Sequence, residues 1–260
     1  MSKSVLAIAA HPDDIEIFMA GTLFLLKEKG YDIHYMNVAN GSCGTVEHDK
    51  ESIIKIREQE ARDACAYIGA TYYPSICSDL EIFYSNENLQ KVAAVVRQAK
   101  PDIVLTHAPQ DYMEDHMITS RLAVTAAFSR GMPNYITEPD CEPIQGDVAV
   151  YQAMPHGLCD PLRQPVSSEF YVNVESVIDQ KKEMLGKHAS QKNWLDVSQG
   201  MDSYIVTMTE FMQAIGTCSG SYQFAEGWRR HLHWGFSADD TDPLAEILSD
   251  DIVFDPGKTS

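Results

Sequence analysis

Three polar side chains that could perform metal or acid–base chemistry stand close together near the start of the chain. His11, Asp13 and Asp14 directly follow the apolar run VLAIAA at residues 5–10. Such a run predicts a buried strand, and side chains at the carboxyl end of a strand in an open α/β sheet point into the crevice where ligands bind. An imidazole and two carboxylates in that place predict a metal site.

A catalytic zinc or similar ion takes three protein ligands of nitrogen or oxygen type and leaves a fourth position for water. His11 and Asp14 supply two ligands from one tight turn, which cannot surround an ion by itself. His116, which follows a second apolar run at residues 103–106, is the best candidate for the third ligand, and His107 is its rival. We therefore expect a zinc ion (Zn2+) on His11, Asp14 and His116, although Fe2+ or Co2+ could use the same ligands.

Asp13 lies between the first two ligands and could act on the water without binding the ion. A metal lowers the pKa of bound water from 15.7 towards ~7, and a nearby carboxylate can take the proton and return it to a leaving amine. The structural alternatives are that Asp13 caps the following helix and that His11 and Asp14 form only a hydrogen-bonded pair. We expect Asp13 to serve as the general base and acid of amide hydrolysis.

The elements that must position these residues alternate between apolar runs and helical periodicity, which is typical of βαβ units and a parallel sheet. Strands are expected over residues 4–10, 32–38, 71–74, 103–106, 148–154 and 170–174. Helices are expected over residues 15–29, 52–68, 117–129, 175–188 and 202–216, and another, marked by apolar residues from Leu89 to Val96, ends before Pro101. Gly30 and Gly69 stand where helices should end. The pattern predicts an α/β fold with a doubly wound, mostly parallel sheet and helices on both faces.

The 260 residues are enough for one large domain or two small ones. We expect a single domain over residues 1–236. Residues 237–260 are polar and acidic with little periodicity, which predicts a loosely packed C-terminal tail.

Charge and composition exclude several classes of function. With 38 acidic and 20 basic residues the formal net charge is −18, which repels phosphate backbones and anionic membrane surfaces. We expect neither a nucleic-acid partner nor a membrane partner. The N-terminal apolar run is too short for a signal peptide, and six scattered cysteines without a Cys-x-x-Cys pair indicate reduced thiols. A cytoplasmic protein is expected.

The opening run AAHPDDIEIFMAGTL resembles the LmbE-like or PIG-L-type N-acetylglucosaminyl deacetylases. The similarity recurs at residues 57–60 and at Asp115-His116, and more loosely at residues 188–191 and 222–227. The resemblance implies a Rossmann-like α/β fold and zinc-dependent removal of an acyl group, usually acetyl, from an amino sugar or its conjugate. It also implies a small-molecule substrate and a homo-oligomer, since relatives are often trimers or hexamers.

Carried onto matching positions, the resemblance assigns the metal ligands and the general base to the four residues already named. It places Arg57 and Asp79 where relatives have groups that bond sugar hydroxyls. The alternative for Arg57 is an ion pair with Glu60 along its own helix.

One position departs from the family pattern. Many relatives have a histidine three positions before the third ligand, where it helps to stabilise the tetrahedral oxyanion, whereas this chain has Met113, which cannot donate such a bond. Losing one such donor can cost about 10²–10³ in turnover. Tyr112, His107 or His188 could replace it, and we expect catalytic roles for Tyr112 and His188. A histidine at the end of a helix, such as His188, is also favoured by the helix dipole without any function.

Other functions remain open at the level of sequence. An amidase acting on a larger thiol-sugar conjugate would use the same residues, as would a metal-containing sugar-binding protein without turnover. A nucleotide-binding Rossmann protein is disfavoured, because the first strand is followed by His-Pro-Asp-Asp and not by a glycine-rich phosphate loop.

Overall fold

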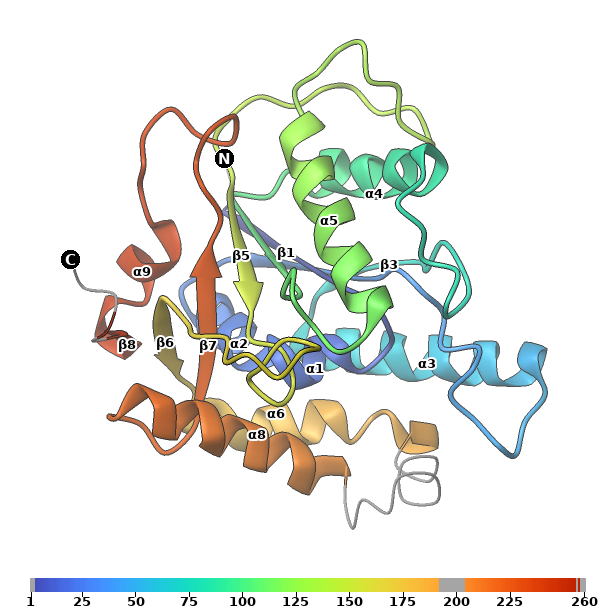
Figure 1. Cartoon of the computed structure of the whole chain (residues 1–260). Helices are drawn as coiled ribbons and strands as arrows, with labels where there is room; N and C mark the ends of the chain where they lie inside the picture. The colour runs from blue at the N-terminus through green and yellow to red at the C-terminus, as the bar shows by residue number, and fades with distance from the viewer. Residues whose placement is uncertain (1–2, 192–203, 256, 258–260) are drawn as a thin grey trace.

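The structure is a computed structural model of the chain, and it describes residues 3–191, 204–255 and 257. In this part of the chain the strands form one eight-stranded sheet with the order β3-β2-β1-β4-β5-β7-β6-β8 (Figure 1). The strands are β1 Ser4–Ala9, β2 Asp32–Asn37, β3 Thr71–Tyr73, β4 Ile103–Thr106, β5 Ala149–Ala153, β6 Phe170–Asn173, β7 Ala225–Arg230 and β8 Ile252–Phe254. Strands β1 to β5 pair in parallel, whereas β7, β6 and β8 add an antiparallel part at one side.

The strand order reverses between β1 and β4. Val5 on β1 pairs with Ile33 on β2 and with Ile103 on β4, so the carboxyl ends of β1 and β4 lie side by side. Open α/β sheets bind their ligands outside the carboxyl ends of the strands at such a reversal. The topology therefore brings the turn after β1 next to the loop after β4.

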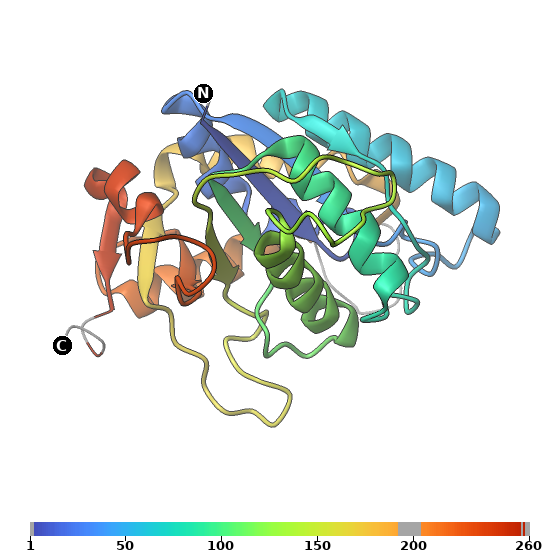
Figure 2. The ribbon, with the colours of Figure 1, turned by 90° about the horizontal axis from the view of Figure 1, so that it is seen from above.

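Helices cover both faces of the sheet, as predicted. They are α1 Asp14–Phe18, α2 Ala20–Glu28, α3 Lys50–Ile68, α4 Asn86–Ala99, α5 Glu114–Ser129, α6 Ile178–Leu185, α8 Tyr204–Ser219 and α9 Pro243–Ile247, with 3-10 turns η1 Glu175–Val177 and η2 Ser249–Asp251. Helices α4 and α5 lie on one face, and α1, α2, α3, α6 and α8 lie on the other (Figures 1 and 2). The α/β, mostly parallel and doubly wound fold class is confirmed.

Strand β1 shows why its sequence is apolar without alternation. Val5 and Ala7 face the core under α2, α6 and α8, while Leu6 and Ile8 face the core under α4 and α5. All of these side chains are fully buried. A strand that is buried on both faces reads as a continuous apolar run, and it forms a rigid base for the residues that follow it.

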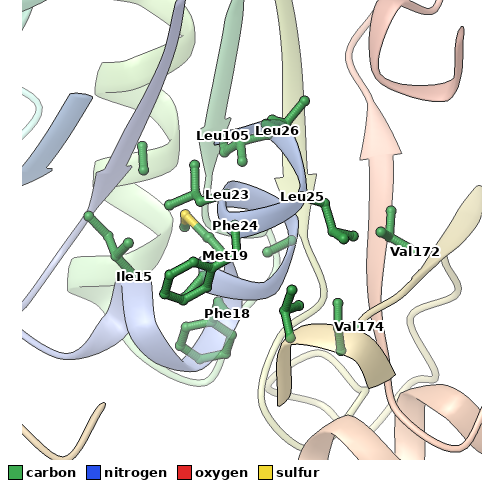
Figure 3. Packing of buried hydrophobic residues seen from close by; sticks show 14 of the residues in the cluster. Ile15, Phe18, Met19, Leu23, Phe24, Leu25, Leu26, Leu105, Val172 and Val174 are labelled. Atoms are coloured by element: carbon green, nitrogen blue, oxygen red, sulfur yellow. The ribbon is translucent and has the colours of Figure 1, made fainter. Parts of the chain in front are cut away.

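The predicted single helix over residues 15–29 is wrong in one respect, because the chain bends at Met19 and forms α1 and α2. The second helix begins where Glu226 of β7 accepts hydrogen bonds from the amides of Gly21 and Thr22, each at 2.8 Å. A Cβ atom at Gly21 would lie 2.5 Å from Val174, so only glycine fits this contact. Side chains of α1 and α2 pack towards β6 and Val174 (Figure 3).

The predicted loose tail over residues 237–260 is also wrong for most of its described part. Leu244 and Leu248 are fully buried in the core, and β8 pairs with β6 at the edge of the sheet. Asp242 caps α9 and accepts a 2.6 Å hydrogen bond from the Tyr151 hydroxyl. The few apolar residues of this segment lie among acidic residues in the sequence, so their periodicity is hard to recognise.

Strand β7 was not predicted, because its sequence AEGWRR contains charges that are typical of a loop. In the fold Glu226 is fully buried and Trp228 packs in the core. The partners of the Glu226 carboxylate come from distant parts of the chain, so the local sequence does not predict them. Within the described residues, none of the helices has the length and apolar character needed to cross a membrane.

Candidate metal centre and active site

Three side chains from the turn after β1 and from the start of α5 meet at the strand reversal. His11 Nδ1 lies 3.3 Å from Asp14 Oδ2, and His116 Nε2 lies 3.4 Å from Asp14 Oδ1. One ligand atom from each residue lies within 4.8 Å of the others. Two ligands held 2.0–2.1 Å from one tetrahedral zinc ion are about 3.4 Å apart, so the donor types and spacings of this set fit such an ion. We call these three residues the metal centre.

Each histidine of the metal centre has a second carboxylate behind it. His11 Nε2 lies 3.0 Å from Asp115 Oδ2, and His116 Nδ1 lies 3.1 Å from Asp111 Oδ1. Metal-binding histidines usually donate their other ring N–H to a carboxylate, which fixes the tautomer and the ring orientation. In the neutral rings that bind a metal, the nitrogens that face Asp14 are thereby left as acceptors. Sequence reasoning missed the positioning roles of Asp111 and Asp115, although both stand within five residues of His116.

The electrostatics of the metal centre favour a cation. Burial lowers the pKa of His11, but hydrogen bonds with Asp115 and Asp14 outweigh it and raise the pKa to about 9. Burial likewise opposes protonation of His116, yet the charge of Asp14 and a bond with Asp111 raise its pKa to about 10. The pKa of Asp14 lies well below its usual value despite burial, chiefly because of His116.

His107, the rival third ligand, is engaged elsewhere. Its Nε2 accepts a 3.0 Å hydrogen bond from the Ala10 amide, and Asp14 Oδ2 lies farther away, at 3.3 Å. Burial, together with the neighbouring His116, lowers the pKa of His107, and a ring whose Nε2 accepts a hydrogen bond carries its proton on Nδ1. A second possible group formed by His107, Asp111 and His116 therefore has a ring with no free lone pair. This favours His116 over His107 as the third ligand.

Asp13 stands at the N-cap position of α1, but its side chain makes no capping hydrogen bond. Its φ angle of 104° is unusual for a residue other than glycine and costs about 1–3 kcal/mol. Asp13 Oδ2 instead accepts a 3.0 Å hydrogen bond from Arg57. The alternative that Asp13 acts only as a helix cap is therefore wrong. Burial raises the pKa of Asp13 above its usual value, and the charge of Arg57 opposes that rise.

Arg57 is buried and holds the turn after β1 in place. Its Nη2 donates to Asp13 and to the carbonyl oxygen of Pro12. A Cβ atom at Gly41 would come within 2.6 Å of the Arg57 side chain, which shows how closely the loop after β2 covers it. The alternative pairing of Arg57 with Glu60 does not occur, because the Glu60 carboxylate accepts bonds from the amide and the hydroxyl of Ser190.

Asp79 and Tyr112 both line the cavity beside the metal centre, but Asp79 is held by hydrogen bonds whereas Tyr112 is largely exposed. The Asp79 oxygens accept hydrogen bonds from the amides of Gly41 and Cys43, at 2.7 and 2.9 Å. Asp79 thus shapes the loop after β2 in addition to any contact with a sugar. Tyr112 is 58% exposed, and its ring centroid lies 5.7 Å from that of His116.

His188 does not line the cavity, so its predicted contact with substrate requires correction. Its side chain is fully buried, and its Nε2 lies 3.5 Å from Glu16 Oε1. Glu16 in turn accepts a hydrogen bond from the Tyr35 hydroxyl. His188 therefore lies behind the wall of the site, because the end of α6 packs beneath α1. From there it cannot touch a substrate in the cavity.

The metal centre opens into a cavity of about 570 Å³, a size typical of small-molecule sites. Besides the residues already described, its lining includes side chains that sequence reasoning missed. These are Ile17, Phe18, Leu80, His156, Gln191, Tyr204 and Met208. They come from segments far apart in the chain, and only the helical periodicity of α1 and α8 could have drawn attention to some of them.

Comparison with known proteins supports the resemblance seen in the sequence. Residues 6–127 match the family described as PIG-L: GlcNAc-PI de-N-acetylase. The diacetylchitobiose deacetylase of Thermococcus kodakarensis is 27% identical over 238 residues, which cover 87% of this chain and 82% of that protein. The 4-oxalmesaconate hydratase of Pseudomonas putida is 27% identical over 203 residues, which cover 74% of this chain and 75% of that protein.

A solved structure gives the same result for the fold. The crystal structure of GalB, the 4-carboxy-2-hydroxymuconate hydratase of Pseudomonas putida, matches with a TM-score of 0.75 at 23% identity, and it covers 94% of this chain and 100% of that chain. The matched segment contains most of β1, all of β4, the metal centre and Asp13. The predicted resemblance to this family is therefore confirmed over residues 6–127.

Proposed function

We propose that this protein is a metal-dependent hydrolase that removes an N-acyl group, in the simplest case acetyl, from an amino sugar or an amino-sugar conjugate. One observation carries the proposal: Asp13, free of any capping bond and with a raised pKa, stands between two residues of the metal centre and at the wall of the cavity. A relative named as a diacetylchitobiose deacetylase supports the choice of substrate.

In the proposed mechanism, zinc held by His11, Asp14 and His116 would polarise the amide carbonyl and lower the pKa of water. Asp13 accepts the proton of the attacking water as the oxygen–carbon bond forms. Protonated Asp13 then donates this proton to the nitrogen as the carbon–nitrogen bond breaks, so the amine leaves neutral. Arg57 orients the Asp13 carboxylate through the 3.0 Å hydrogen bond between them.

The proposal also concerns the identity of the ion, the kind of substrate, the cellular location and the oligomeric state. Two nitrogens and one oxygen form a ligand set that suits zinc, with Fe2+ or Co2+ as the alternatives. We propose a small, soluble substrate and a cytoplasmic site of action, which the net charge of −18 and the free cysteines support. A homo-oligomer, trimeric or hexameric, stays a prediction.

A second candidate function is hydration of a double bond. The relative from Pseudomonas putida is named as a hydratase and is as similar to this chain as the deacetylase is, at 27% identity. Adding water to a double bond also needs activated water and a carboxylate that moves a proton. Met113, in place of a hydrogen-bond donor, leaves this candidate open together with sugar binding without turnover.

The test is release of acetate from a panel of N-acetylated amino sugars and their conjugates, larger thiol conjugates included, by the zinc-loaded protein. We expect turnover by the wild type and a loss of about 10³-fold or more in His116→Ala. His231→Ala, which changes a histidine outside the cavity, is the matched control. Absence of acetate from every compound, together with loss of a conjugated double bond from unsaturated acids, would replace the deacetylase with the hydratase.

A further inference from the structure

Five aromatic rings contact one another in a closed circuit, and four of them line the cavity. Ring centroids are 5.8 Å apart for Phe18 and His116, 5.7 Å for His116 and Tyr112, and 6.3 Å for Tyr112 and His156. The circuit closes through Phe211, at 5.3 Å from His156 and 5.6 Å from Phe18. We call these five rings the aromatic wall. It begins directly at His116 of the metal centre.

The aromatic wall is assembled from separate parts of the fold. Phe18 ends α1, Tyr112 precedes α5, Phe211 lies on α8, and His156 lies in the long connection between β5 and β6, which projects from the body of the molecule in Figure 2. Phe18 and Phe211 are buried and fix the back of the wall, whereas Tyr112 is exposed at the mouth. Such a surface favours contact with hydrocarbon or aromatic groups.

The side chains next to the aromatic wall are apolar as well. Ile17, Met113 and Met208 line the same cavity. Met113 adds a flexible apolar side chain to this lining. Methionine adapts its shape to varied apolar partners. This side of the cavity therefore gains contact energy from a large acyl substituent more than from a methyl group.

The opposite side of the site has its polar groups engaged within the protein. Asp79 bonds two backbone amides, and Arg57 bonds Asp13 and the carbonyl oxygen of Pro12. Gln191 donates to the carbonyl oxygen of Gly44. Each of these groups thus spends part of its hydrogen-bonding capacity within the protein. Apolar contact therefore supplies a share of the binding energy for the substrate.

The proposed chemistry orients the substrate between these two sides. Protonated Asp13 must reach the amide nitrogen, so the amine and its sugar lie near Asp13 and Arg57. The acyl substituent is bonded to the other side of the carbonyl carbon. With the carbonyl at the metal centre, the substituent points towards His116 and the aromatic wall.

We propose that the aromatic wall is an acyl subsite that selects N-acyl groups longer than acetyl, either alkyl chains of several carbons or aromatic acyl groups. This inference rests on the proposed function and adds the class of acyl group to it. A hydrocarbon group could also be carried by the sugar, as an apolar aglycone. It would then lie on the side of Arg57 and Asp79.

The experiment measures kcat/KM of the zinc-loaded enzyme for N-acetyl-, N-butyryl-, N-hexanoyl- and N-benzoylglucosamine. The hexyl glycoside of N-acetylglucosamine is the matched arm, because it carries the added hydrocarbon on the sugar. Each buried methylene should raise kcat/KM about threefold to fourfold, so the hexanoyl compound should exceed the acetyl compound by at least about tenfold. The hexyl glycoside should show no comparable gain.

Variants locate the effect on the aromatic wall. Tyr112→Ala and His156→Ala should lower kcat/KM for the hexanoyl compound several-fold more than for the acetyl compound, whereas Tyr112→Phe keeps the ring and the preference. Leu162→Ala is the control, since Leu162 lies in the same connection as His156, is 81% exposed and does not line the cavity.

Two results would overturn the acyl subsite while leaving the deacetylase intact. One is a kcat/KM that stays equal to that of the acetyl compound, or falls below it, as the acyl chain lengthens. The other is a preference for the longer acyl group that Tyr112→Ala and His156→Ala leave unchanged. A gain confined to the hexyl glycoside would move the apolar group to the aglycone. If no N-acyl sugar in the series is hydrolysed, the proposed function fails and the acyl subsite fails with it.

Discussion

Two clusters of buried charge in this molecule differ in how their polar atoms are satisfied. In the first, between β7, α6 and α2, the fully buried Glu226 accepts bonds from Lys181 and from the amides of Gly21 and Thr22. Lys181 also donates to the carbonyl oxygen of Ile17. Every charged atom thus has close partners within the protein. We call this cluster the structural ion pair.

The metal centre is arranged in the opposite way. Asp14 lies 3.3–3.4 Å from the ring nitrogens of His11 and His116, which is longer than a strong charged hydrogen bond. Among the described residues, Asp111 Oδ2 behind His116 has no hydrogen-bond partner although it is buried. Asp14 Oδ2 accepts a 2.7 Å hydrogen bond from the His11 amide, and the Asp14 carboxylate also faces the two histidine rings beside the cavity. Burial of charge alone therefore does not mark a functional site, whereas ligand atoms of three residues that face one another beside a cavity do.

The largest expected effect comes from removing the central carboxylate of the metal centre. Asp14→Ala should lower kcat/KM for the best substrate by about 10⁴-fold or more, because it disables an interdependent set of groups. Steady-state kinetics in the presence of added zinc measures this loss, with circular dichroism as the check on folding. A folded Asp14→Ala variant with near wild-type turnover would contradict a catalytic role for the metal centre, and with it the difference between the two clusters.

The structural ion pair should respond in stability and not in chemistry. Glu226→Gln leaves Lys181 buried without its ion-pair partner, which costs about 3–5 kcal/mol of unfolding free energy. Urea unfolding measures the change, and kcat per folded molecule should stay close to that of the wild type. Glu183→Gln, which changes an exposed carboxylate that accepts a hydrogen bond from Tyr67, is the control and should have little effect. Loss of activity without loss of stability in Glu226→Gln would contradict the structural role.

The smallest expected effect is a shift in the pH profile. Burial raises the pKa of Asp13, and Arg57 holds that rise in check. Because Asp13 must lose its proton to act as a base, kcat/KM should rise with pH through its raised pKa. Arg57→Met removes the opposing cation, so the acid limb should move to higher pH. The pH dependence of kcat/KM measures the shift, and a limb that stays in place or moves to lower pH would exclude Asp13 as the base.

The sequence predicts that His11, Asp14 and His116 lie together, and the structure places them so, because these parts are local or follow from strand order. His11, Asp13 and Asp14 lie in one turn after an apolar strand. His116 follows the strand that neighbours β1 in a doubly wound sheet, so the topology rule brings it to the same place. The same rule could not decide between His116 and His107, since the Ala10 amide that engages His107 appears only in the fold.

The parts that the sequence did not predict depend on contacts between distant segments. The bend at Met19 exists because Glu226, about two hundred residues later in the chain, caps the new helix. The aromatic wall unites Phe18, His156 and Phe211, none of which belongs to a motif. The burial of His188 follows from the packing of α6 against α1. Helical periodicity alone does not predict that this side chain is fully buried.

The most direct measurement is the thermal unfolding of chelator-treated protein with and without added zinc, for the wild type and for Asp14→Ala. A ligand that binds only the folded state at 100 times its Kd stabilises that state by about 2.7 kcal/mol. We predict a clear rise in Tm with zinc for the wild type and for Glu226→Gln, and none for Asp14→Ala. An equal rise in Asp14→Ala, or no rise in the wild type, would contradict a metal centre built from His11, Asp14 and His116.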